Sequence, residues 1–434
     1  MSQRRTCRGF RGNASTDGSL SRRQLLALGS GATAGLAGCT GSVPLLGDGG
    51  APPVRIEDGT FVRDGSPMFP HGFNYIRVRQ HPDGYPWHDT FNPDSYDPEE
   101  SESMFAHLEE HGFNLVRVFV DHIAGPGVIP ENGATNFSEP YMANVFDFLE
   151  RARNHGVAVI LTFPWLPRRQ SYNELTANPL SDVAEANRLY LDGGHIDAKA
   201  QYVADFASAI ESYDAGLLPA VFGYHLANEA AVVVDQPPFS LAEGTLTPAT
   251  GETYDLASTE DLTAMVDENV NYWVDTCAAA IREVDPEALV TVDVYPYNAV
   301  GREGPGDFST DGDPRYPARP LALAESAASY LDVHLYTAYP GTLSANLESI
   351  EFEQVRTRAG ERGLPLLMGE FGAFTNEYLD RETAASAMVE RWRQVHERGF
   401  AGYAYWTYKD NGQPLYGATS GEGQIFEALA GTST

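Results

Sequence analysis

Two glutamates close two apolar stretches of the sequence. Glu229 follows the amide Asn228 at the end of residues 221–227, and Glu370 lies between two glycines after residues 364–368. Two carboxyl groups about 5 to 5.5 Å apart can cleave a glycosidic bond with retention, one protonating the leaving oxygen and one attacking the anomeric carbon. Either dipeptide alone can equally cap a helix. The chemistry therefore depends on a fold that brings both positions together.

Eight short β-rich stretches alternate with segments of helical spacing. Such alternation fits a closed barrel or an open doubly wound sheet. No G-x-G-x-x-G follows the first stretch and no G-x-x-x-x-G-K occurs, so nucleotide binding lacks support. Polar residues gather instead at the ends of several stretches, where a barrel builds its site. We predict a (β/α)8 TIM barrel over residues 54–434, with strands at 73–76, 114–120, 157–163, 221–226, 289–294, 331–336, 365–368 and 403–406.

Two further segments frame this predicted barrel. Residues 56–69 contain the pairs Asp58-Gly59 and Asp64-Gly65 between apolar stretches, which indicates a hairpin. We place this N-terminal β-hairpin under the barrel floor. The long loops 230–259 and 295–319 follow the fourth and fifth strands, and we expect them to form rims of a cleft.

The two glutamates end the fourth and the seventh predicted strands. In this respect residues 54–430 resemble clan A of the glycoside hydrolases, most closely family 5, which contains cellulases and β-mannanases. In that clan an Asn-Glu pair ends strand four and a Glu ends strand seven. The resemblance implies that Glu229 is the acid/base, that Glu370 is the nucleophile, and that Asn228 holds the sugar 2-hydroxyl. Many members carry a His near the end of strand three, whereas residues 161–165 here read Leu-Thr-Phe-Pro-Trp.

Four more residues match the clan at predicted strand ends: Arg117, His334, Tyr336 and Trp406. Arg117 and the Tyr336 hydroxyl would keep Glu370 ionised, because a nearby cation or donor lowers a carboxyl pKa. Glu229 must start protonated, so we expect its surroundings to be drier or closer to negative charge. Trp406 would provide the floor on which the reacting sugar stacks. Structural alternatives remain for each: an ion pair for Arg117, a core position for His334, and simple packing for the two rings.

The charge balance excludes one class of partner. The chain has 60 acidic and 29 basic residues and a formal net charge of −31, with Lys199 and Lys409 as its two lysines. Nucleic acid is not an expected partner of so acidic a protein. The pattern resembles proteins of salt-adapted archaea, in which high ionic strength screens the self-repulsion. An ordinary acidic secreted protein is the alternative.

The first residues are typical of an exported lipoprotein. Arg22-Arg23 precede an apolar stretch that ends at Cys39, and the order resembles a twin-arginine signal with a lipobox. The stretch is too short to span a bilayer. We therefore expect an export signal over residues 1–39, a lipid on Cys39, a flexible tether over 40–53 and an extracellular, cell-surface enzyme whose only membrane contact is the anchor. A tail with a chance arginine pair is the alternative.

No H-E-x-x-H motif and no Cys/His cluster occurs, so we expect neither a catalytic metal nor a cofactor. A calcium ion among the loop carboxylates of residues 307–313 is a weak alternative. Cys277 falls in an apolar helical pattern and is predicted to be core filler. Trp87 and Trp165 lie where strands give way to loops and favour a polymeric substrate. The sequence thus predicts a monomeric retaining hydrolase of a β-linked polysaccharide, β-1,4-mannan or β-1,4-glucan. An exo-acting β-glycosidase and a non-catalytic, lipid-anchored carbohydrate-binding protein are the alternatives.

Overall fold

The computed structural model of the protein describes residues 52–80, 86–120, 127–336 and 342–432. The predicted export signal, Cys39 and all but the last two residues of the predicted tether lie outside these ranges. The described residues belong to one compact unit, residues 48–434. Within the described ranges, none of the helices combines the length and the apolar character needed to cross a membrane.

Parallel strands form a barrel in the order β13-β9-β8-β7-β4-β18-β17-β16-β14. β13 pairs with β9 and β14 pairs with β16, so the two are halves of one barrel strand interrupted at Val292. The eight predicted strand positions and the TIM-barrel fold are therefore confirmed. The strands are β4 (His71–Asn74), β7 (Leu115–Phe119), β8 (Ala158–Thr162), β9 (Val221–His225), β13 (Val290–Thr291), β14 (Asp293–Val294), β16 (Leu331–Val333), β17 (Leu366–Phe371) and β18 (Phe400–Tyr405).

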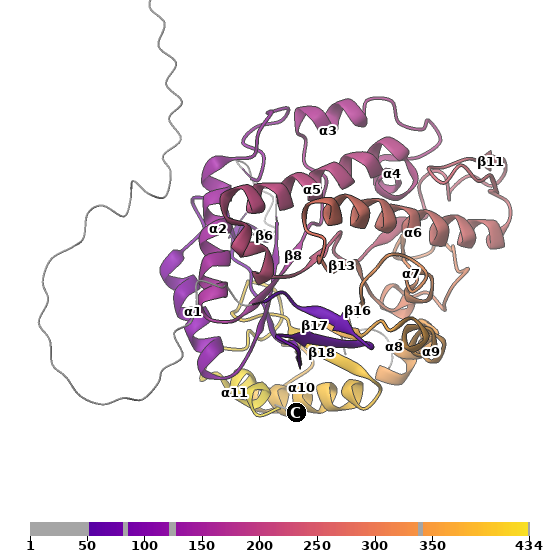
Figure 1. The fold of residues 1–434 in the computed structure, drawn as a ribbon. Helices are drawn as coiled ribbons and strands as arrows, with labels where there is room; N and C mark the ends of the chain where they lie inside the picture. Colours follow the sequence, from indigo (N-terminus) through magenta and orange to yellow (C-terminus); the bar gives the residue numbers. More distant parts are fainter. Residues whose placement is uncertain (1–51, 81–85, 121–126, 337–341, 433–434) are drawn as a thin grey trace, which may run out of the picture. The chain divides into compact units, whose positions relative to one another are not determined.

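Helices surround the strands (Figure 1). Their buried faces carry apolar residues at helical spacing, as on α2, which ends at the C-cap His155. The helices are α1 (Pro98–Glu110), α2 (Glu139–Asn154), α3 (Gln170–Leu175), α4 (Glu185–Leu191), α5 (Gly193–Asp214), α6 (Thr259–Val284), α7 (Pro320–Leu323), α8 (Leu343–Ser349), α9 (Phe352–Arg362), α10 (Arg381–His396) and α11 (Gln424–Ala430). Two 3-10 turns, η2 (Ala215–Ala220) and η3 (Tyr297–Val300), precede β9 and follow β14. Cys277 on α6 is a buried free thiol, as expected of core filler.

The floor of the barrel is covered by β1 (Arg55–Glu57), β2 (Thr60–Arg63) and β3 (Ser66–Pro67). This is a three-stranded antiparallel sheet, one strand more than the predicted hairpin, because each Asp-Gly pair makes its own turn. Asp58 and Asp64 adopt φ of 49° and 53°, the conformation that tight hairpin turns need. The ring of Phe61 packs among Phe222, Tyr330 and the first inward side chains of the strands, which closes this end.

The two predicted rim loops meet one another. β10 (Ala231–Val233) pairs antiparallel with β15 (Arg315–Pro317), so the loop after the fourth strand is bonded to the loop after the fifth. Two further two-stranded ribbons extend this end of the barrel: β5 (Val78–Gln80) with β6 (Pro86–His88), and β11 (Thr245–Leu246) with β12 (Tyr254–Asp255).

Candidate active site

Glu370 reaches the barrel interior because β17 contains a bulge. Met368 pairs with Tyr403 and Phe371 with Tyr405, so three residues of β17 span two of β18. The extra residue lets both Met368 and Phe371 face the surrounding helices while Glu370 turns inward. Gly369 is required beside it, since a Cβ there would lie 2.2 Å from a carboxylate oxygen of Asp332.

The carboxylate of Glu370 is held by two strong donors. Arg117 Nη1 donates to Oε1 at 2.6 Å, and the Tyr336 hydroxyl donates to Oε2 at 2.7 Å. Nδ1 of His334 lies 3.6 Å from Oε2. Arg117 and Tyr336 were expected beside Glu370 from the sequence, and the structure brings both of them, together with His334, to this carboxylate. His334 and Tyr336 lie just beyond the end of β16, which is shorter than the predicted strand 331–336.

Arg117 on β7 connects the two halves of the site. Its buried guanidinium donates to Asn74 and Glu370 through Nη1, and to Asn228 and Asp293 through Nη2 at 2.7 and 2.8 Å. Because the Oδ1 of Asn228 accepts from Arg117, its Nδ2 remains a donor for a ligand such as a sugar hydroxyl. Fixed donors of this kind hold a reactive geometry without reorganisation.

Glu229 follows β9 in a strained backbone conformation. Its φ is 53°, the left-handed region that non-glycine residues rarely adopt outside turns. Its backbone N–H donates to the buried carboxylate of Asp293 on β14, which stabilises this conformation. The side chain accepts a 3.1 Å hydrogen bond from Nδ1 of His334. One carboxylate oxygen of Glu229, one of Glu370 and a His334 nitrogen all lie within 4.8 Å of one another.

The charges around His334 keep it protonated. Burial disfavours the imidazolium, but the carboxylates of Glu370 and Asp293 and the hydrogen bond to Glu229 raise the pKa of His334 to about 9. A charged imidazolium is a donor at both nitrogens, so Nδ1 can donate to Glu229. At neutral pH the site thus holds two cations, Arg117 and His334, among the carboxyl groups of Glu229, Glu370 and Asp293.

The electrostatic expectations for the two glutamates are met in part. Burial raises the pKa of Glu370 above its ordinary value, and the charges of His334 and Arg117 only oppose that rise. The side chain of Glu370 is 6% exposed against 20% for Glu229, so Glu229 is not the drier of the two. The other expectation for Glu229, closeness to a negative charge, is met by Glu370 itself.

Three site residues were missed by sequence reasoning: Asn74, His225 and Asp293. Asn74 accepts from Arg117 and donates to Gly369 O and Ala404 O, while His225 Nδ1 lies 3.0 Å from Asp293 Oδ2. A signal for Asp293 exists in residues 290–294, which read Val-Thr-Val-Asp-Val. The three valines pack toward the helices, so alternation points the aspartate inward.

The tryptophans divide into buried and exposed rings. Trp406 is 5% exposed and packs with Ile76, Phe119 and Tyr336, so it forms part of the wall that surrounds the two glutamates. Trp165 is 51% exposed beyond the third strand. The side chain of Trp87 lies outside the described residues.

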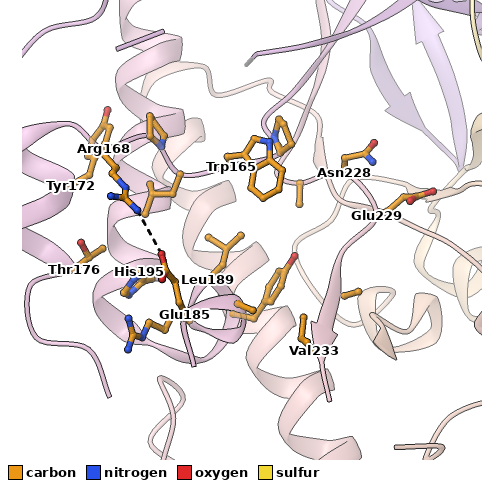
Figure 2. A pocket seen from close by; sticks show the side chains of 18 of the residues that line it. Trp165, Arg168, Tyr172, Thr176, Glu185, Leu189, His195, Asn228, Glu229 and Val233 are labelled. Carbon is orange, nitrogen blue, oxygen red and sulfur yellow. Dashed lines mark ion pairs between the residues drawn. The ribbon is translucent and has the colours of Figure 1, made fainter. Parts of the chain in front are cut away.

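A cleft of about 1100 Å³ opens beside Glu229 and Asn228 (Figure 2). Trp165 and Arg168 border it on the side of the third strand, and Val233 and Arg315 of the paired rim loops border it beyond the fourth. A small-molecule pocket measures about 300 to 1000 Å³, so this cleft has room for more than one sugar unit.

Within the described ranges, one group of three side chains has the spacing of a metal site: Glu229, His334 and Glu370. Each is already engaged in the hydrogen bonds given above. The charges of Arg117 beside Glu370 and of protonated His334 oppose a further cation at this position. The same carboxylate spacing suits two-carboxylate glycoside hydrolysis.

The family model described as cellulase (glycosyl hydrolase family 5) matches residues 71–412. Similar solved structures include an endo-1,4-β-mannanase from Rhizomucor miehei, with 16% identity, a TM-score of 0.54 and coverage of 87% of this chain and 98% of that chain. An endo-β-1,4-mannanase from Thermotoga petrophila has 13% identity, a TM-score of 0.55 and coverage of 84% of this chain and 76% of that chain. An exo-β-1,4-mannosidase from Opitutaceae bacterium strain TAV5 has 18% identity, a TM-score of 0.52 and coverage of 85% of this chain and 57% of that chain. At these identities the likeness is one of fold. No curated protein sequence matches the chain.

Proposed function

Since the chain belongs to glycoside hydrolase family 5, we propose that it cleaves β-1,4 bonds of a mannan or a glucan with retention of configuration. Glu370 is the nucleophile and Glu229 the acid/base in this proposal. The observation that carries it is the approach of the two carboxylates to within 4.8 Å, at the open end of the barrel and beside a cleft. Retention requires about 5 to 5.5 Å between the carboxyl groups, whereas inversion requires about 6.5 to 9.5 Å.

The first step forms a glycosyl-enzyme ester. A Glu370 oxygen bonds to the anomeric carbon, the bond to the leaving oxygen breaks, and Glu229 gives its proton to that oxygen. Arg117 and Tyr336 orient the attacking carboxylate, and protonated His334 stabilises the charge that Glu229 gains. In the second step Glu229 takes a proton from water, whose oxygen attacks the same carbon and releases Glu370.

The mannan and glucan alternatives are distinguished by product analysis. The family model is described as a cellulase, while the similar structures named above are mannanases and a mannosidase. Proton NMR during hydrolysis of β-1,4-linked manno- and gluco-oligosaccharides identifies the sugar and the anomer that forms first. Retention predicts the β anomer first, followed by slow mutarotation, and the α anomer would contradict the proposal. Glu370→Ala, checked for folding by circular dichroism, is the control for contaminating activity.

Endo action is favoured over exo action by the size of the cleft beside Glu229. An endo enzyme lowers the viscosity of a polysaccharide solution faster than it releases reducing ends. Proportional changes, with release of a single sugar or dimer from the start, would support the exo-acting alternative. A protein that binds oligosaccharides without releasing reducing ends would support the non-catalytic alternative.

We also propose export through a twin-arginine signal, lipid anchoring at Cys39 and adaptation to high salt. The support is the order of arginine pair, apolar stretch and cysteine, together with a net charge of −31 and two lysines. Mass spectrometry of the mature N-terminus and detergent partitioning of Cys39→Ser test the anchor. Activity and melting temperature measured from 0.1 to 4 M salt test the adaptation, which predicts that both rise with salt.

A further inference from the structure

The cleft beside Glu229 reverses the charge balance of the protein. Acidic residues outnumber basic ones 60 to 29 in the whole chain. The cleft is lined by three arginines, Arg168, Arg188 and Arg315, against two glutamates, Glu185 and Glu229. One of these glutamates is the proposed acid/base. A local excess of guanidinium groups in so acidic a protein indicates a ligand that carries negative charge.

Arg188 has an available guanidinium. It lies on α4 and is partly buried, and its Nε donates to the carbonyl of Val183 at 3.1 Å, which fixes the stem of the group. Among the described residues, no carboxylate lies within ion-pair distance of Arg188. A planar guanidinium with both terminal nitrogens available is suited to bidentate binding of a carboxylate.

The guanidinium of Arg168 has only a weak partner among the residues that the structure describes. Figure 2 shows its guanidinium directed toward Glu185 across the cleft, and the closest atoms are 3.7 Å apart. The two side chains are 70% and 82% exposed, and an exposed ion pair of this kind contributes little. An anionic ligand can therefore replace Glu185 as the partner of Arg168. Arg315 differs, because Asp313 binds it through two oxygens and the ring of Tyr295 lies 5.4 Å away.

We propose that this cleft binds a sugar unit that bears a carboxylate, so that the substrate is a polysaccharide with uronic acid units or acidic substituents. Arg188 is the primary partner of the carboxylate and Arg168 the second. The exposed ring of Trp165 in the same lining offers an apolar face to the sugar ring. The inference rests on the proposed function, because it concerns the substrate of that site.

The test uses β-1,4-linked tetrasaccharides of glucose and of mannose. Each is supplied as the neutral sugar, with one unit oxidised to the C6 carboxylate at each position in turn, and with a C6 sulfate at the same positions. The measured quantity is kcat/KM at one molar salt for the full chain and for Arg188→Met, Arg188→Lys and Arg168→Met. Arg356→Met is the matched control, since it removes a guanidinium that pairs with Glu353 on α9.

We expect the wild type to prefer one carboxylated tetrasaccharide over its neutral counterpart by about tenfold, as one charge-assisted hydrogen-bonded pair supplies. Arg188→Met should lose this preference, measured as the ratio of kcat/KM on the carboxylated sugar to kcat/KM on its neutral counterpart. Arg168→Met should lose part of the preference for the carboxylated sugar, and Arg356→Met should lose none of it. Melting temperatures exclude unfolding, and Arg188→Lys should retain an intermediate preference because it keeps the charge.

Three results overturn the inference. They are equal rates of the wild type on carboxylated and neutral sugars, a preference for sulfate over carboxylate, and the same loss in Arg188→Met and Arg356→Met. In each case hydrolysis of the neutral sugars leaves the proposed function intact. If no tetrasaccharide is cleaved by the wild type, the proposed function fails as well.

Discussion

The two glutamates of the site are held in opposite ways. Glu370 lies on a strand, is almost fully buried, and accepts from Arg117 and Tyr336. Glu229 follows its strand with a left-handed backbone and is three times as exposed, and His334 is the one side chain within the described ranges that hydrogen-bonds to its carboxyl group. The rigid, dry carboxylate has the surroundings of an attacking group, whereas the exposed one can exchange protons with the leaving oxygen and with water. The difference supports the two roles proposed above, which the residue type, shared by both positions, does not distinguish.

The largest effect on activity should come from replacing the buried glutamate, Glu370. Glu370→Gln keeps the shape and the hydrogen-bonding groups but cannot form the ester, so kcat should fall by about 10⁴-fold or more on every substrate. The fall in kcat should be the same for a polysaccharide and for aryl glycosides. Activity near that of the wild type on any β-linked substrate would remove Glu370 from this role.

The exposed side should give a smaller, substrate-dependent effect. Glu229→Gln removes the proton donor, and general acid-base catalysis contributes about 10²- to 10⁴-fold. A polysaccharide should show this full loss. An aryl glycoside with a dinitrophenolate leaving group needs no protonation, so its first step should be nearly unaffected in a pre-steady-state burst. An equal fall in rate on both substrates would contradict the role of Glu229 as the proton donor to the leaving oxygen.

Asp293 lies between the two sides and should have an intermediate effect. Asp293→Asn removes a charge that pairs with Arg117 and that raises the pKa of His334. We expect kcat/KM to fall by roughly 10- to 100-fold, in line with the loss of a buried charged hydrogen bond. The alkaline limb of the pH profile should also move to lower pH. Asp214→Asn, which removes a surface carboxylate paired with Arg153, is the control and should change neither quantity.

The stability of the fold should report on His334. The pKa of His334 is raised to about 9 in the folded chain against 6.5 for an unperturbed imidazole, so its contribution to stability is complete below pH 6.5 and is lost as the pH rises through about 9. The shift corresponds to on the order of 3 kcal/mol. Denaturant unfolding from pH 6 to 10 should therefore show the wild type losing more stability than His334→Gln. Parallel curves would indicate an uncharged His334.

The smallest effect should be that of Trp165. Trp165→Ala removes an exposed ring of the cleft, and one stacking contact contributes about 1 kcal/mol. We expect KM for the polysaccharide to rise by about fivefold with kcat nearly unchanged. Hydrolysis of an aryl monosaccharide that does not reach the cleft should be unaffected, and a fall in its kcat would mean that Trp165 shapes the catalytic centre instead.

Much of the fold and part of the site could be predicted from the sequence. Strand positions follow from apolar stretches between helices, whereas Arg117 was predicted from the resemblance to clan A, and β7 places it between the outward-facing Val116 and Val118. The inward turn of Glu370 could not be predicted, because alternation places it on the outer face and only the bulge in β17 reverses this. Asp293 was missed because its strand was interpreted as uniformly apolar. The dry surroundings of Glu370 depend on packing between distant strands, which spacing along the chain does not encode.

The packing of Phe61 across the barrel floor also bears on where the described chain enters the domain. Arg55 pairs with Glu287 and Arg63 donates to Gly156 O, both just before barrel strands begin, so the described chain enters the domain at its sealed end. Because Phe61 and its neighbours seal this end, a substrate reaches Glu229 and Glu370 from the opposite end of the barrel, where the paired rim loops and the cleft lie.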